Sequence, residues 1–155
     1  MTGVRLRFAA AVALFLGWLG WLGVAVLEKG KHPVVSRSQL TAATHVVVAE
    51  VTVGPDGLPA PTAKVVETLS GPALPAETVI EVLNLPSALP PGAGQFPGPG
   101  RYLVPVVNDG PTYRVAGLPS SPGYDAATPA RPAVYVWDEA TRAQLVGLGI
   151  PGPRP

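Results

Sequence analysis

The sequence predicts a single N-terminal transmembrane helix followed by a mainly β domain, a small barrel of five to six strands with a short helix before it and one at the C-terminus. Two observations carry this prediction. Residues 8–27, FAAAVALFLGWLGWLGVAVL, contain no charged or amide side chain. After them, short valine-rich runs alternate with loops rich in Pro and Gly, which is the pattern of a small all-β domain.

The apolar segment is long enough to cross a bilayer as a helix. At about 1.5 Å of rise per residue it spans roughly 30 Å, the thickness of the hydrocarbon core, and a helix pairs its backbone polar groups internally. The alternative is a cleaved secretory signal, since Arg5 and Arg7 form a short basic region ahead of it. A signal's apolar region, however, has about 7–15 residues and ends at a small-x-small site. Because this run is longer and leads directly into Glu28 and Lys29, we expect a retained anchor, with a secreted soluble protein as the alternative.

Basic residues at the two ends of the segment set its expected orientation. Arg5 and Arg7 lie on a very short N-terminal tail, and Lys29 and Lys31 follow the segment. The positive-inside rule then favours a cytoplasmic N-terminus in a single-pass protein of the cell membrane. The chain is thereby divided into a cytoplasmic tail (1–7), a transmembrane helix (8–27), a juxtamembrane linker (28–35), an extracytoplasmic β domain (36–148) and a Pro/Gly-rich tail (149–155).

The β domain carries no excess of positive charge. The whole chain has a net charge of +1, and the basic residues that flank the apolar segment supply more than this excess. Nucleic-acid binding is therefore excluded, because a domain that reads phosphates needs a basic stripe. The chain also contains no cysteine, so no disulfide can form and the domain must be stabilised by its core.

The clearest strand is HVVVAEVTV at residues 45–53. Its side chains alternate, so that Val47 and Val51 are expected to face the core. Val46 and Val48 lie on the opposite face, which we expect to be the less buried one.

Turn residues and caps delimit the other elements. Ser36 is suited to cap a short helix before the first strand, and Asp138 to cap a closing helix that runs through Leu148. Glu67 shares a face with Val65 and Leu69, which requires a bulge or a position at the rim. Pro105 lacks a ladder donor, which predicts an edge position or a bulge. The remaining strands are expected at residues 63–69, 78–83, 101–107, 112–116 and 133–137.

The order of these segments supports a family resemblance. HVVVAEVT, KVVETLSGPAL, TVIEVL and GRYLVPVV with its following YRV hairpin resemble the OB-fold barrel of tissue-inhibitor and netrin-type modules, and especially uncharacterised bacterial envelope proteins with such a domain. The resemblance covers residues 40–116 and implies an OB-like barrel. Animal inhibitors of this family reach a protease's zinc through an N-terminal cysteine. This chain has no cysteine and begins with an apolar helix, so that mechanism cannot be carried over to any of its residues.

Motifs for catalysis or cofactor binding do not stand out. His32 and His45 lack the spacing of metal ligands. The SSPG sequence at 120–123 is a turn rather than a nucleophile elbow, and the Gly-rich pieces of 92–100 lack the Lys-Ser/Thr of a phosphate loop. We therefore predict no catalytic, cofactor-binding or metal-binding residue. An enzyme whose site is assembled from scattered Asp, Glu, Arg and Tyr side chains stays as the alternative.

Aromatic side chains near the Pro-rich loops are the candidate partner-binding residues: Phe96, Tyr102, Tyr113 and Tyr124. The loop at residues 85–100 is too rich in Pro and Gly for regular structure, so Phe96 is expected to be exposed there and to serve a partner rather than the fold. For Tyr102, a place in the core competes with this role. The function predicted from the sequence is a membrane-anchored binding or assembly module for a protein or envelope partner.

The retained anchor predicts that the full chain stays in the membrane fraction after alkaline and high-salt washing. Leu19→Arg should weaken insertion by about 2.5–3.5 kcal/mol, because it places a charge near the bilayer centre. Fractionation followed by N-terminal sequencing measures both effects. Recovery of the wild-type protein as a soluble species without its apolar segment would contradict the anchor.

Overall fold

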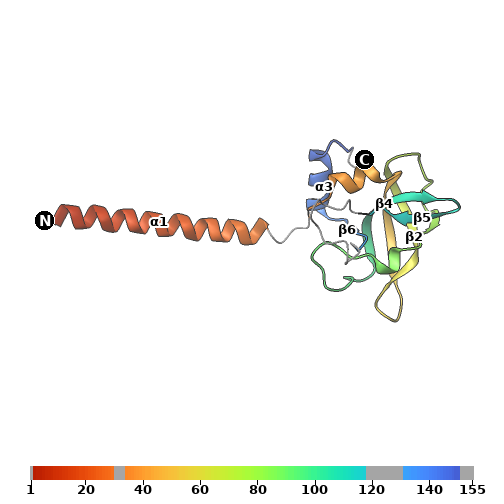
Figure 1. Cartoon of the computed structure of the whole chain (residues 1–155), viewed down its shortest axis with the longest axis horizontal. Helices are drawn as coiled ribbons and strands as arrows, with labels where there is room; N and C mark the ends of the chain where they lie inside the picture. The colour runs from red at the N-terminus through yellow and green to blue at the C-terminus, as the bar shows by residue number, and fades with distance from the viewer. Residues whose placement is uncertain (1, 30–33, 118–130, 151–155) are drawn as a thin grey trace. The chain divides into compact units, whose positions relative to one another are not determined.

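The computed structural model describes residues 2–29, 34–117 and 131–150 of the chain, which divides into two compact units, Met1–His32 and Pro33–Pro155 (Figure 1). The first unit is the helix α1 (Thr2–Lys29). Within it, Ala10–Leu27 is long and apolar enough to cross a membrane or to be a signal sequence. Phe15, Trp18 and Trp21 of this stretch are exposed. The helix therefore presents apolar side chains that a water-soluble protein would bury.

The second unit is built on a six-stranded, mainly antiparallel sheet in which the hydrogen-bonded order is β3-β2-β1-β4-β5, with β6 paired to β4. Two short helices and a 3-10 turn complete it. The strands are β1 (His45–Val53), β2 (Pro59–Ser70), β3 (Val79–Glu81), β4 (Gly100–Asp109), β5 (Thr112–Val115) and β6 (Tyr135–Val136), and the helices are α2 (Arg37–Ala42), η1 (Leu85–Ser87) and α3 (Glu139–Gly147). The predicted strands are thus present, with β3 and β6 shorter than expected.

The sheet is open, so the small barrel predicted from the sequence is not closed. Its two edge strands are β3 and β5, and Val82, the residue after β3, forms an isolated parallel bridge with Tyr113 of β5. After this bridge, the side-chain amide of Asn84 pairs with the backbone of β5, as a strand backbone would. Its Oδ1 accepts a hydrogen bond from the N–H of Val115 (2.7 Å), and its Nδ2 donates to the carbonyl of the same residue (3.2 Å). The ladder stops there because the next residues, Leu85–Ser87, turn into η1.

Strand β1 is buried on both faces. On one face, Val47 and Val51 belong to a core cluster shared with β2, β4 and η1. On the other, Val46 and Val48, each 1% exposed, pack in a second cluster with Leu40 of α2 and Leu145 of α3. The expectation that Val46 and Val48 occupy a less buried face is therefore wrong. The reason is that α2 and α3 lie side by side over this face of the sheet (Figure 1).

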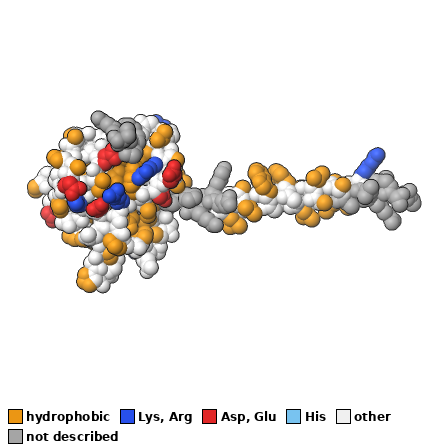
Figure 2. Space-filling view, turned by 180° about the vertical axis from the view of Figure 1, so that it is seen from behind, with side chains coloured by type: hydrophobic (Ala, Val, Ile, Leu, Met, Phe, Trp, Pro, Cys, Tyr) orange, Lys and Arg blue, Asp and Glu red, His pale blue; other side chains and the backbone are white. Residues whose placement is uncertain are grey.

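Farther along β1, the same face of the sheet carries charges. Glu50 lies between Lys64 of β2 and Arg101 of β4 in the register of the sheet, and its carboxylate pairs with the guanidinium of Arg101 (3.3 Å). Lys64 pairs with Glu77, which raises the pKa of Lys64. Figure 2 shows acidic and basic side chains interspersed on one face of the domain. Because opposite charges neutralise one another here, this surface forms no single-sign patch.

Both predicted helix caps are confirmed. The hydroxyl of Ser36 accepts a hydrogen bond from the N–H of Gln39 (3.3 Å), and the carboxylate of Asp138 accepts one from the N–H of Thr141 (2.8 Å). The predicted bulge in β2 is also present, since the register with β1 shifts by one residue between Glu67 and Val65.

Pro105 lies inside β4, paired with Val46, and not at an edge or a bulge as predicted. Its carbonyl accepts a hydrogen bond from the N–H of Ala116 (2.8 Å). The N–H and C=O of one residue in an antiparallel strand point to the same side. Along this side, β4 pairs with β6 up to Leu103 and with β5 from Val106 onward. The position at which Pro105 lacks an N–H therefore lies between these two partners, where no ladder bond is lost.

A buried polar network joins α2 to the last strand. Tyr135 and Gln39, both 0% exposed, are joined by a hydrogen bond of 2.7 Å from the Tyr135 hydroxyl to the Gln39 Oε1. The Nε2 of Gln39 donates to the carbonyls of Ala116 and Ala133 (2.8 Å each), and the Tyr135 hydroxyl accepts from the N–H of Ser36 (3.0 Å). Burial raises the pKa of Tyr135, so the phenol stays protonated as a donor.

The two-sided burial of β1 predicts that Val48→Asp unfolds the domain as completely as Val47→Asp, because each leaves an unpaired charge in a core. Thr52→Asp, at an exposed position of the same strand, is the matched control and should cost no more than about 0.5 kcal/mol. Proteolysis of the full chain across a urea series measures all three. A mild effect of Val48→Asp would contradict burial of the second face.

Candidate functional site

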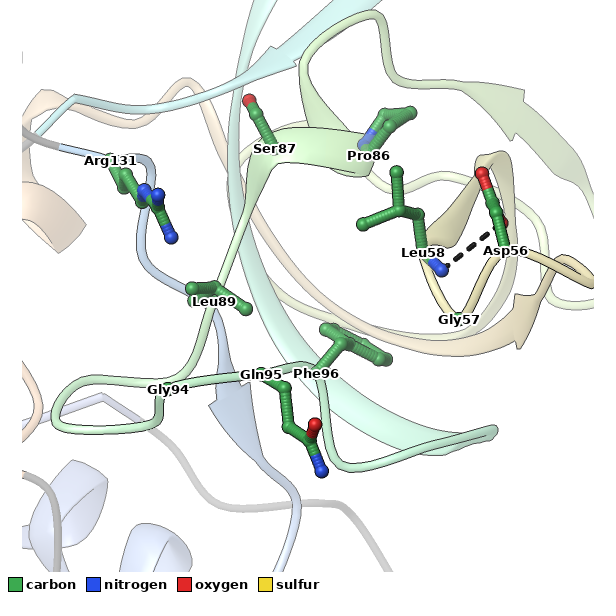
Figure 3. Close-up of a pocket in the computed structure, with 10 residues that line it drawn as sticks. All are labelled: Asp56, Gly57, Leu58, Pro86, Ser87, Leu89, Gly94, Gln95, Phe96 and Arg131. Carbon is green, nitrogen blue, oxygen red and sulfur yellow. Dashed lines mark hydrogen bonds between the residues drawn. The ribbon is translucent and has the colours of Figure 1, made fainter.

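A cleft of about 530 Å³ opens between the turn that joins β1 to β2 and the segment that follows η1 (Figure 3). Its lining combines apolar, polar and charged side chains from three separate parts of the sequence. The lining residues are Asp56, Gly57, Leu58, Pro86, Ser87, Leu89, Gly94, Gln95, Phe96 and Arg131.

One wall of the cleft is the β1–β2 turn. Gly57 adopts a positive φ of 77°, which glycine reaches without strain. The carboxylate of Asp56 accepts a hydrogen bond from the N–H of Leu58 (3.1 Å), and the N–H of Gly54 donates to the carbonyl of Leu58 (2.8 Å). These bonds fix the turn, so that Leu58 projects into the cleft (Figure 3) with 48% of its surface exposed.

The opposite wall is the segment after β3. Leu89 forms a parallel bridge with Ala133, in which its N–H donates to the carbonyl of Pro132 (3.1 Å) and its carbonyl accepts from the N–H of Val134 (3.3 Å). Leu85, the first residue of η1, and Ala88, directly after η1, are buried in the core. The expectation that residues 85–100 serve a partner rather than the fold is therefore wrong for this part of the segment.

Phe96 forms part of the cleft and is not exposed as predicted. The residue is 7% exposed, and its ring packs against the ring of Tyr102, with 4.7 Å between the ring centroids. The hydroxyl of Tyr102 donates to the carbonyl of Gly98 (2.7 Å), and burial raises the pKa of this phenol. Phe96 thus packs in the core against apolar residues of β4, and only a small part of the surface of Phe96 is exposed in the cleft.

The other predicted partner-binding tyrosines lie elsewhere. Tyr102 is buried and contributes to the core beneath Phe96. Tyr113 is half-buried on β5, where its ring meets the ring of His45 edge-on at 5.6 Å, outside the cleft. Tyr124 lies outside the described residues. Of the predicted set, the structure thus places Phe96 in the cleft lining.

Charged groups stand at opposite sides of the cleft, Asp56 beside the turn and Arg131 across from it (Figure 3). Asp56 holds the turn through its hydrogen bond to Leu58. Arg131 is exposed and makes no hydrogen bond or ion pair with any other residue that the structure describes. An approaching ligand therefore meets an apolar centre with an anion on one side and, on the other, a cation that no described residue pairs.

Sequence reasoning missed Leu58, Leu89 and Arg131. Leu58 carries a weak signal, since an apolar side chain within the turn sequence GPDGLP has no neighbours in its own strand to bury it. Arg131 carries none, because a lone arginine beside a proline resembles any surface residue. Arg131 lies two residues before Ala133, and the bridge between Ala133 and Leu89 places this stretch beside the cleft.

The chemistry of the lining favours binding. Its hydroxyl, that of Ser87, donates to the carbonyl of Asn84 (2.8 Å). Within residues 2–29, 34–117 and 131–150, no three His, Asp or Glu side chains come together to hold a metal ion. Comparison with protein-family models, with curated proteins and with solved structures finds no match to the chain. The role of the cleft therefore rests on its own residues.

The packing of Phe96 predicts that Phe96→Ala destabilises the domain by about 3–5 kcal/mol, the range for a buried phenylalanine. Gln95→Ala, which shortens an exposed neighbour in the same segment, is the control and should leave stability within about 0.5 kcal/mol of wild type. Urea unfolding followed by proteolysis gives both values. Equal stability of the two variants would contradict the burial of Phe96 and would mean that its ring is exposed.

Proposed function

We propose that this protein is a membrane-anchored binding or assembly module whose β domain lies outside the cytoplasm and holds a protein or envelope partner in the cleft. The observation that carries the proposal is the composition of the cleft. Leu58 and Leu89 offer apolar surface at its centre, and Arg131 offers a cation without a partner among the described residues. Ligand sites commonly combine an apolar lining with a few polar groups that fix orientation.

Helix α1 supports the proposal that the protein is anchored in a membrane. Its apolar side chains are exposed along the whole of Ala10–Leu27, and a lipid environment removes that surface from water. In the sequence, the apolar run leads directly into Glu28 and Lys29, whereas the shorter apolar region of a signal ends at a small-x-small site. The cytoplasmic placement of the N-terminus rests on the basic residues around the helix.

An OB-like architecture is part of the same proposal. Such folds are partly open five-stranded barrels that bind ligands through the loop between their first two strands and the neighbouring face. In support, β1 pairs with both β2 and β4, β3 approaches β5 in parallel, and the β1–β2 turn forms a wall of the cleft.

The proposal assigns no catalytic step to the cleft. A nucleophile needs a base within hydrogen-bond reach. The Ser87 hydroxyl instead donates to a backbone carbonyl, and the lining residues include no histidine. Binding needs neither feature.

Photo-crosslinking tests the proposed function in cells that produce the full chain. With a benzophenone amino acid in place of Leu58 we expect a covalent adduct, because this half-exposed side chain projects into the cleft. The same probe in place of Val79, which is 63% exposed on β3 and outside the cleft, is the control and should give none. Adducts of equal yield at both positions, or none at Leu58, would contradict a partner in the cleft.

A further inference from the structure

We propose that the occupant of the cleft is an extended peptide segment that carries an apolar side chain and, two residues away on the same side, an acidic one. This inference rests on the proposed binding function and adds the chemistry of the ligand. Three features of the cleft point to it: an apolar centre, and, among the residues that the structure describes, an unpaired stretch of backbone and a cation without a partner.

The backbone of Gly94, Gln95 and Phe96 makes no hydrogen bond within the described part of the chain, and Gly94 and Gln95 are exposed, so a second chain can reach them. The N–H of Ala93 donates to the carbonyl of Pro90 (3.0 Å), and sheet pairing resumes at Gly100. Between them, the N–H and C=O groups of these three residues make no hydrogen bond to the rest of the described chain. They follow one side of the cleft (Figure 3). An extended peptide can satisfy such groups by adding as a strand.

The apolar centre sets which side chain the peptide brings. Side chains of an extended segment point alternately to opposite sides, so one of them enters the space between Leu58 and Leu89 while its neighbours point outward. Leu58 is half exposed in the free protein. An apolar side chain would remove this surface from water together with its own, which favours binding.

The charged groups of the cleft set the direction in which the peptide chain binds. An acidic side chain beside Arg131 gains a charge-assisted hydrogen bond that no other described residue supplies. The same side chain beside Asp56 would be repelled. Because the two groups lie on opposite sides of the cleft, they favour one direction of the bound chain and disfavour the reverse. Asp56 also disfavours the phosphate backbone of a nucleic acid in this cleft.

Selection from a phage-displayed library of random linear heptapeptides tests the inference, with the full chain in detergent micelles as the target. The wild-type protein should enrich peptides that combine an apolar residue with Asp or Glu. Arg131→Glu should enrich peptides with Lys or Arg at the same position. It should also weaken binding of the wild-type peptides by about tenfold or more, the loss expected for one hydrogen bond to a charged group.

Two controls make the result specific. Arg142→Glu removes a cation that stacks on Trp137 (5.0 Å from the ring centroid) outside the cleft, so it should leave the selected peptides unchanged. Methylation of the backbone nitrogens of a selected peptide should abolish binding if the chain pairs as a strand.

Enrichment of peptides that keep their acidic residue against Arg131→Glu, or unchanged binding of the N-methylated peptide, would overturn the inference. Failure to enrich any sequence would also overturn it. The crosslinking experiment separates this failure from that of the proposed function, since an adduct at Leu58 without peptide selection would mean that the cleft binds a partner by other chemistry.

Discussion

The hydrogen bond between the Tyr135 hydroxyl and the Gln39 side chain is the contact on which the architecture of the domain depends. Neither residue is exposed, so every polar atom in this network must be satisfied from within the protein. The amide of Gln39 meets this demand by donating to the carbonyls of Ala116 and Ala133. Loss of a member would leave a buried donor or acceptor unpaired, which costs about 1–3 kcal/mol. The network therefore ties α2, which covers the second face of the sheet, to the strand β6.

This network also reaches the cleft. Gln39 binds the carbonyl of Ala133, and Ala133 is the residue that bridges to Leu89 in the cleft wall. Arg131 lies two residues earlier on the same stretch. On the other side, the Asx-type bond between Asp56 and Leu58 fixes the β1–β2 turn independently of the core. The cleft is thus formed between a wall positioned by the buried network and a turn that positions itself, which is a suitable arrangement for a preorganised site.

A small cleft of this kind gains from attachment to a membrane. The surface that it offers is modest, and exposed ion pairs contribute little by themselves. For a partner held at the same membrane, the proposed anchor would raise the effective concentration, so that a weak site is well occupied without further contacts. The proposed anchor and the proposed peptide site therefore support each other physically. The compensated charges of Glu50, Arg101 and Lys64 on another part of the surface add no competing attraction for nucleic acid.

Local patterns in the sequence determined the apolar helix, the bounds of β1 at His45–Val53, the bulge near Glu67 and the caps at Ser36 and Asp138. Each of these depends on residues a few positions apart, whose geometry is set by the backbone itself. Tertiary structure alone decided that Val46 and Val48 are buried, that Phe96 packs on Tyr102, and that the sheet stays open between β3 and β5. It also brought Leu58, Leu89 and Arg131 together. The physical reason is that burial and site geometry depend on which distant segments pack against a residue, and alternation along one strand cannot show what covers its second face.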